Sequence, residues 1–271
     1  MDFPFDVSRL SDILRRSVTP AQPRHMLVMF HYGRCGSTVL GSQIGQHAEM
    51  FWEGELFEEM FRGRIHEHRL VRNPWRLLSL RHLYAGLRMY GLEVKYHPCY
   101  HLSKPILDLS PEACFGHLQA EGATHFIVLK RKNYLRQQIS EEVGRQQNQW
   151  HRSKGEDNRV HSVTLDPECV RFGGCEPSLL ESFRRRDAMY ETMEYLLEDE
   201  QSLWLTFEDH IRDDPRVGYR KAANFLGLNP IDTQITTRRT NPHPIKDLLD
   251  NYGEVSGRME GTPYEWMLTD G

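Results

Sequence analysis

Seven consecutive residues, Tyr-Gly-Arg-Cys-Gly-Ser-Thr from Tyr32 to Thr38, combine a cation, two glycines and two hydroxyls. An apolar run at residues 26–30 precedes them and is long enough for a buried strand, and apolar side chains follow at helical spacing as far as Ile44. A strand, a glycine-containing turn and a helix N-terminus together form an anion site, because the free amides of the first helical turn and the helix dipole point at the turn. The sequence therefore predicts a bound phosphate or sulfate group here.

A second group of cations follows another apolar run. Residues 126–129 read as a strand of a buried parallel sheet and continue into Lys130, Arg131 and Lys132, and Ser140 stands nine residues after Arg131. A dianionic phosphate prefers cations and a hydroxyl at the end of a strand and the start of a helix. These residues predict a second phosphate contact, and the alternative is a solvated basic turn.

The first turn differs from the nucleotide loop of ATP- and GTP-hydrolysing enzymes. Their Walker A motif places a lysine directly after its second glycine and before a hydroxyl that holds magnesium. Here Ser37 takes the place of that lysine, and the cation, Arg34, comes two positions before Gly36. The acidic residues nearest to a Walker B position are Glu208 and Asp209, after the fourth expected strand. A P-loop kinase that uses ATP or GTP is therefore an alternative function and not the preferred one.

The two motifs together resemble those of the sulfotransferases that use 3′-phosphoadenosine-5′-phosphosulfate (PAPS). The turn is similar to their 5′-phosphosulfate loop, and Arg131 with Ser140 is similar to their 3′-phosphate site. The doubled basic residues and residues 251–264 are most similar to bacterial carbohydrate sulfotransferases, of the trehalose and lipooligosaccharide-modifying kind. The resemblance covers most of residues 26–265. It implies these cofactor-binding residues: Gly33, Arg34, Cys35, Gly36, Ser37, Thr38, Arg131 and Ser140.

The resemblance also implies an activity. A sulfonate group would move in line from PAPS to a hydroxyl of a small polar acceptor, such as a carbohydrate, a glycolipid or a secondary metabolite, with PAP as product and without a metal. Arg34 would stabilise the charge that grows on the leaving oxygen. A neutral hydroxyl needs a general base, and Gly54-Glu55 is similar to the segment in which several members of the family carry a catalytic glutamate. Arg34 and Glu55 are therefore the expected catalytic residues.

Other side chains compete with Glu55 for the role of base. They are Glu53 and a histidine after the second expected strand, His97 or His101. Neighbouring aromatic residues, Trp52 and Phe57, are expected to desolvate a carboxylate here and raise its pKa. The alternative is a pair of exposed carboxylates on a turn, and the corresponding alternative function is a non-catalytic module that binds PAP or phosphate.

Short strands alternate with helices along the whole chain, which predicts a P-loop-like three-layer α/β fold with a central parallel sheet of about four to five strands and flanking helices. The expected strands are 26–30, 92–96, 126–129 and 203–207. The expected helices are 37–46, 58–88 with a break at Pro74, 111–120, 134–150, 178–200, 215–226 and 245–252. One domain, 1–271, is expected, with an N-terminal helix at 1–22 and a lid or substrate loop at 151–177.

Composition excludes several classes of function. A formal net charge of −4 gives no general attraction to nucleic acid. No apolar run is long enough for a membrane span, and the N-terminus lacks the apolar block of a secretory signal. Five widely spaced cysteines without a Cys-x-x-Cys pair indicate reduced thiols and a cytoplasmic protein. The 14 histidines form no zinc-binding pattern, so no metal is expected.

Overall fold

A central parallel sheet organises the protein. The computed structural model describes residues 25–62, 73–147, 152–153, 160–235, 237–238 and 243–269. Five strands form the sheet in the order β2-β3-β1-β4-β6, and all neighbouring pairs are parallel. Their bounds are Met26–His31 for β1, Met50–Gly54 for β2, Met89–Lys95 for β3, Ala123–Lys130 for β4 and Ser202–Thr206 for β6. The expected α/β fold with a parallel sheet of four to five strands is confirmed.

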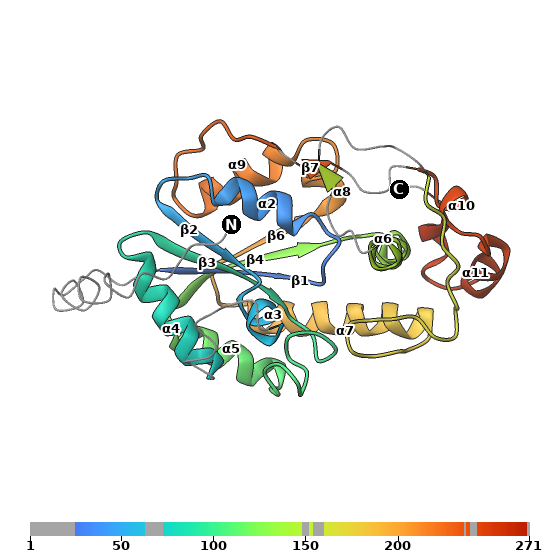
Figure 1. The fold of residues 1–271 in the computed structure, drawn as a ribbon, viewed down its shortest axis with the longest axis horizontal. Helices are drawn as coiled ribbons and strands as arrows, with labels where there is room; N and C mark the ends of the chain where they lie inside the picture. Colours follow the sequence, from blue (N-terminus) through green and yellow to red (C-terminus); the bar gives the residue numbers. More distant parts are fainter. Residues whose placement is uncertain are drawn as a thin grey trace.

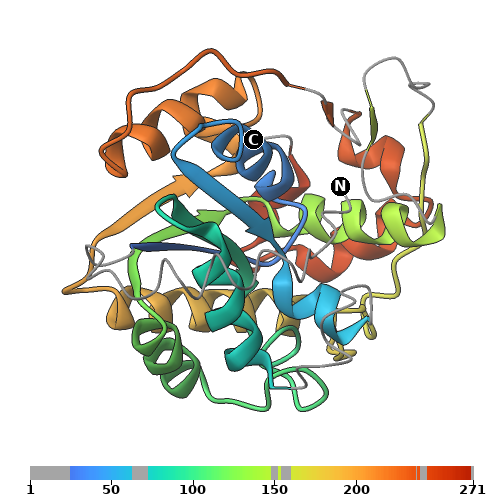
Figure 2. The same cartoon turned by 60° about the vertical axis from the view of Figure 1, so that its left-hand side comes forward.

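Helices cover both faces of this sheet. On one face lie α2 (Ser37–Ile44) and α9 (Pro215–Phe225), and on the other lie α4 (Pro74–Ala85), α5 (Pro111–Ala120) and α7 (Leu179–Leu196) (Figures 1 and 2). The short helix α3 (Leu56–Phe61) follows β2, and α6 (Tyr134–Gln146) follows β4 beyond the carboxyl ends of the strands. Two very short strands, β5 (Arg152–Ser153) and β7 (Thr237–Arg238), form a separate antiparallel pair. The layers therefore match the three-layer arrangement predicted from the sequence.

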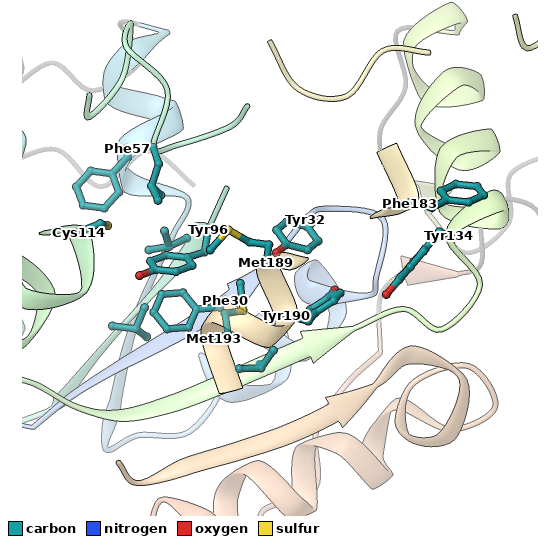
Figure 3. Packing of buried hydrophobic residues seen from close by; sticks show 14 of the residues in the cluster. Phe30, Tyr32, Phe57, Tyr96, Cys114, Tyr134, Phe183, Met189, Tyr190 and Met193 are labelled. Carbon is teal, nitrogen blue, oxygen red and sulfur yellow. The ribbon is translucent and has the colours of Figure 1, made fainter. Parts of the chain in front are cut away.

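The central strand is buried on both sides, which explains its continuous apolar sequence. Val28 and Phe30 of β1 contribute to the larger core, while Leu27 and Met29 point to the opposite face and contribute to the smaller one. In the larger core, the ring of Phe30 packs against that of Tyr96 with 4.5 Å between centroids (Figure 3). A strand held in this way positions the residues that follow it with little freedom.

Helix starts follow the expected capping chemistry. The hydroxyl of Ser110 accepts a hydrogen bond from the amide of Ala113 at 3.2 Å, and that of Ser178 accepts one from the amide of Glu181 at 3.4 Å. The carboxylate of Glu181 pairs with Arg185 and Arg184. Ser178 is therefore the N-cap residue of α7 (Leu179–Leu196), while the carboxylate of Glu181 is engaged by the two arginines that follow in the helix.

Three segments differ from the sequence prediction. Strand β2 was not expected, because Phe51-Trp52-Glu53 has no clean alternation and lies at the sheet edge. The fourth expected strand ends at Thr206, since the Thr206 hydroxyl caps a short helix, α8 (Phe207–His210). The expected helix 245–252 is divided into α10 (Ile245–Leu248) and α11 (Tyr252–Met259), followed by η3 (Glu265–Leu268). It breaks because Leu249 is extended and forms a bridge with Val163.

Two cysteines form a disulfide, whereas the sequence favoured reduced thiols. Cys99 and Cys175, with Cα atoms 5.5 Å apart, join the loop after β3 to the segment 160–177. The amide of Gly174 also donates to the Cys99 carbonyl at 2.6 Å. The expectation of reduced thiols was wrong for this pair, because the two cysteines are 76 residues apart in the sequence and only the fold brings them together. The cysteines therefore give no support to the expected cytoplasmic location.

Removing this disulfide should destabilise the fold. Replacing Cys99 and Cys175 by serine reopens a loop with a sequence separation of 76 residues, which typically costs about 2–4 kcal/mol of unfolding free energy. Urea unfolding of the double variant and of the oxidised wild type measures the difference. Cys169→Ser, at an exposed free thiol, is the matched control and should leave the midpoint unchanged. Equal midpoints for the double variant and the wild type would contradict the prediction.

Some expectations fall outside the described residues. The N-terminal helix expected at 1–22 lies there, as do residues 148–151 and 154–159 around the expected lid. In the described part of the chain, no helix is both long and apolar enough to cross a membrane.

Candidate active site

The turn between β1 and α2 has an unusual backbone. Left-handed φ angles occur at Gly33 (80°), Arg34 (52°) and Gly36 (87°). A Cβ atom at Gly36 would lie 2.6 Å from Cγ2 of Ile211, so this position requires glycine. For Arg34, which has a Cβ, the left-handed region costs about 1–2 kcal/mol. Such a conformation persists only where surrounding contacts hold it, and such sites are often functional.

Contacts from α6 and from the end of β4 hold the turn. Nε of Arg34 donates to Oγ of Ser140 at 2.9 Å, and Nη1 of Arg131 donates to the Arg34 carbonyl at 2.7 Å. Nε2 of Gln137 donates to the Gly33 carbonyl at 2.6 Å. The two phosphate motifs predicted from separate parts of the sequence therefore form one continuous set of contacts.

Arg131 is buried but incompletely bonded. Its side chain is 7% exposed, and its guanidinium lies over the ring of Phe207 at 4.6 Å. Burial lowers the pKa of Arg131 to about 10 against the opposing charge of Glu208, so the group stays positive at neutral pH. Among the described residues its buried Nε has no hydrogen-bond partner, and it lies 4.0 Å from Oε1 of Glu208. Because buried donors are nearly always paired, this atom fits a site for an anionic ligand.

The neighbours of Arg131 in the basic run point elsewhere. The ammonium of Lys130 lies over the ring of Tyr190 at 4.4 Å, and that of Lys132 pairs with Asp209 at 2.6 Å on the surface. Neither lysine lines the cavity described below, whereas Arg131 does. The alternation of side chains at the end of β4 thus selects one of the three cations.

The hydroxyl residues of the turn also differ in position. Ser37, which is 5% exposed, and the exposed Thr38 begin α2 and line the cavity. The side chain of Cys35 belongs to the smaller core and is fully buried. If Cys35 binds a ligand, it must therefore do so through its backbone amide.

Glu55 lies on the other side of the turn. It follows Gly54, the last residue of β2, and is the N-cap residue of α3. Its Oε2 lies 2.7 Å from Nζ of Lys95, the last residue of β3. The carboxyl ends of β1, β2 and β3 therefore bring the Arg34 turn, Glu55 and Lys95 to one edge of the sheet, where ligands of open α/β sheets bind.

The ionisation of Glu55 differs from the sequence expectation. Burial acts to raise its pKa, but the charges of Lys95, His31 and His101 and the hydrogen bond from Lys95 together outweigh burial, and the pKa is lowered. The expected aromatic neighbours do not cover the carboxylate, because Trp52 packs against Gly41 and Gly91 and Phe57 lies in the larger core. Glu55 is therefore an ionised carboxylate at neutral pH, and the expectation of a raised pKa was wrong.

The competing bases lie outside the cavity wall. Glu53 accepts two hydrogen bonds from Arg81, at 2.9 and 2.7 Å. His97 accepts from the Cys99 amide, and burial lowers its pKa to about 3. His101 is fully buried and accepts from the Lys95 amide at 3.1 Å. Of these four candidates, all within the described residues, Glu55 alone lines the cavity.

Several polar residues of the site were missed by the sequence analysis. His31 accepts from the Gly33 amide at 2.9 Å and lies 3.0 Å from Glu93 in β3. Lys95 and Glu141 also face the cavity. A charged residue inside an apolar strand, such as Glu93 in Leu92-Glu93-Val94, was the available signal, because such residues are rarely buried without a role.

Metal-ligand atoms gather around Glu55. His31, Glu55 and Glu93 form one group within 4.8 Å, and Glu55, Glu58 and His101 form another. Both groups share Glu55, whose carboxylate already binds the ammonium of Lys95. A lysine in this place supplies the positive charge that a cation would supply. That the protein needs no metal stays a prediction.

A single large cavity connects these groups. Its volume is about 1150 Å³, somewhat above the usual range of about 300–1,000 Å³ for small-molecule sites. The turn, Arg131 and Ser140 line it, and so do Glu55, Lys95, Tyr100 and residues 173–175, which include the disulfide-linked Cys175. A cavity of this volume has room for two small molecules.

No family model matches the chain, and no curated protein matches it. Among solved structures, it is similar to the sulfotransferase domain of the Synechococcus PCC 7002 olefin synthase, with 15% identity and a TM-score of 0.43, over 79% of this chain and 76% of that one.

Proposed function

We propose that this protein is a sulfotransferase that moves a sulfonate group from PAPS to a hydroxyl of a small polar acceptor, a carbohydrate, a glycolipid or a secondary metabolite. One observation carries the proposal. Arg34, Arg131 and Ser140, which the two phosphate motifs contribute, contact one another in the wall of a cavity that also holds Glu55. This pairing of two anion-binding groups with a carboxylate suits a donor with two phosphate groups and a hydroxylic acceptor.

The described residues fit such a donor. Gly36 has a left-handed backbone at which a Cβ would collide with Ile211, and Nε of Arg131, which has no hydrogen-bond partner among the described residues, offers a buried donor. Arg131 and Ser140 would hold the 3′-phosphate, and the turn with the first amides of α2 would hold the phosphosulfate. When bound, PAPS supplies the activated sulfonate.

The chain's own residues then have separate roles. Arg34 and the start of α2 stabilise negative charge at the leaving oxygen. Glu55 orients the acceptor hydroxyl and takes its proton, and Lys95 keeps the carboxylate ionised. The walls of the cavity hold both molecules in line, which supplies much of the remaining rate enhancement.

Two other functions compete. A P-loop kinase would need a lysine at Ser37 and a free acidic residue for magnesium, but Glu208 accepts hydrogen bonds from the amides of Lys132 and Asn133. A non-catalytic module would bind PAP without transferring a sulfonate. Calorimetric titration with PAP and with Mg-ATP, followed by sulfonate transfer from PAPS to a panel of sugars and phenols, separates the three. PAP binding with transfer supports the proposal, and binding of Mg-ATP alone rejects it.

Arg131→Ala should weaken PAP binding in the same titration. Loss of a charged hydrogen bond to phosphate costs about 1.5–3 kcal/mol, so the dissociation constant should rise about tenfold to a hundredfold. Lys132→Ala is the matched control, because Lys132 is the next residue and its ammonium pairs with Asp209 on the surface. Unchanged affinity in Arg131→Ala would remove Arg131 from the phosphate site.

A further inference from the structure

The cavity contains a carboxylate that the proposed mechanism does not use. Glu141 lies on α6 directly after Ser140, whose hydroxyl accepts the hydrogen bond from Arg34 at 2.9 Å. It is partly buried and lines the same cavity as Glu55. Its place in the sequence therefore puts a second carboxylate next to the expected transfer centre.

Glu141 differs from other carboxylates of the cavity wall because it has no ion pair with the residues that the structure describes. Four others have a cationic or histidine partner: Glu55 with Lys95, Glu58 with Arg62, Glu93 with His31 and Glu142 with Arg145. Oε2 of Glu141 accepts one hydrogen bond, from the hydroxyl of Tyr100 at 3.3 Å. The remaining acceptor capacity of the carboxylate faces the cavity.

The surroundings of Glu141 leave it poorly compensated. Burial raises its pKa, while the charges of Arg186, Lys95 and Arg34 and the hydrogen bond from Tyr100 act in the opposite direction. A partly buried carboxylate with one hydrogen bond and no ion pair costs free energy, and a hydrogen-bond donor on a ligand would remove part of that cost. The ammonium of Lys95 is paired with Glu55, at 2.7 Å.

We propose that Glu141 binds the acceptor, accepting a hydrogen bond from a second donor group, a hydroxyl or an amine, while another hydroxyl of the same molecule receives the sulfonate. The inference rests on the proposed function. It makes the acceptor a molecule with at least two hydrogen-bond donors, such as a sugar or an amino sugar, rather than a monohydric alcohol or phenol. Glu55 then acts on the reacting hydroxyl, and Glu141 selects the molecule that carries it.

Binding to the PAP-saturated protein tests the inference without turnover. Three probes are titrated by calorimetry: methyl glucoside, its 2-amino analogue and cyclohexanol. The wild type should bind both sugars more tightly than cyclohexanol. In Glu141→Gln the sugars should bind about tenfold or more weakly, with cyclohexanol unchanged. A larger loss for the amino sugar assigns the contact to an amine, and equal losses assign it to a hydroxyl.

Two further variants serve as controls for the loss of the internal hydrogen bond and for the change of charge. Tyr100→Phe removes the internal partner but keeps the carboxylate, so it should retain the preference for the sugars. Glu194→Gln makes the same charge change at an exposed position of α7 and should bind all probes like the wild type. The inference is overturned if the wild type does not prefer the sugars, or if Glu141→Gln binds them equally well. Absence of PAP binding would instead reject the proposed function.

Discussion

Arg34→Ala is expected to lower the rate of sulfonate transfer from PAPS by about 10²- to 10³-fold, the usual effect of removing one donor that stabilises transition-state charge. The side chain is anchored by Ser140 at 2.9 Å and lines the cavity at the start of α2. Burial lowers the pKa of Arg34, but a guanidinium retains its charge at neutral pH. The loss should therefore appear mainly in kcat, because charge at the leaving oxygen is greatest in the transition state.

The measurement is the release of PAP in the presence of the acceptor found in the panel. Arg34→Lys should recover part of the rate, since a lysine supplies charge without the fork that engages Ser140. Arg216→Ala, on α9 with its partner Asp214, makes the same change outside the cavity and serves as control. Transfer at the wild-type rate in Arg34→Ala would remove this residue from the mechanism.

Glu55→Gln should reduce kcat by about 10²- to 10⁴-fold, the range typical of general acid–base catalysis. PAP affinity should stay unchanged, because the carboxylate of Glu55 is paired with Lys95, whereas the proposed phosphate contacts come from Arg131 and Ser140. Glu53→Gln is the matched control, since Glu53 is two residues away but engaged by Arg81. Full activity in Glu55→Gln with lost activity in Glu53→Gln would transfer the role to Glu53.

The role of Glu55 as general base also predicts how the transfer rate depends on pH. Because Lys95 holds the pKa of Glu55 below its usual value, the carboxylate stays ionised through neutral and mildly acidic pH. The acidic limb of the rate profile should therefore lie below the ordinary range of a glutamate. Lys95→Met removes the lowering charge and should move this limb to higher pH. An unmoved limb would show that another group controls it.

Local patterns were enough to predict the layers of the fold and one side of the site. The apolar runs of β1, β4 and β6 are short and uninterrupted, and the capping residues Ser110 and Ser178 directly precede α5 and α7. The turn and Arg131 could be predicted as anion-binding because such sites need particular residue types at strand ends. Such signals lie within about ten residues of one another in the sequence.

What depends on tertiary contacts could not be predicted. Strand β2 is defined by pairing with β3 at the sheet edge and not by its own alternation. The pKa of Glu55 depends on Lys95, which is 40 positions later in the sequence and reaches it only through the order of the strands. The disulfide likewise depends on two loops that meet beside the cavity.

At Arg34, whose backbone is left-handed, the residue that is best for stability differs from the residue that is best for the proposed activity. Glycine adopts a φ of 52° without the penalty that arginine carries there. Arg34→Gly would therefore relieve backbone strain while it removes the side chain proposed to stabilise the leaving oxygen. Selection for heat resistance alone would favour glycine at this turn and discard catalysis, so a stabilised variant of this protein has to be screened for turnover as well as for its melting temperature.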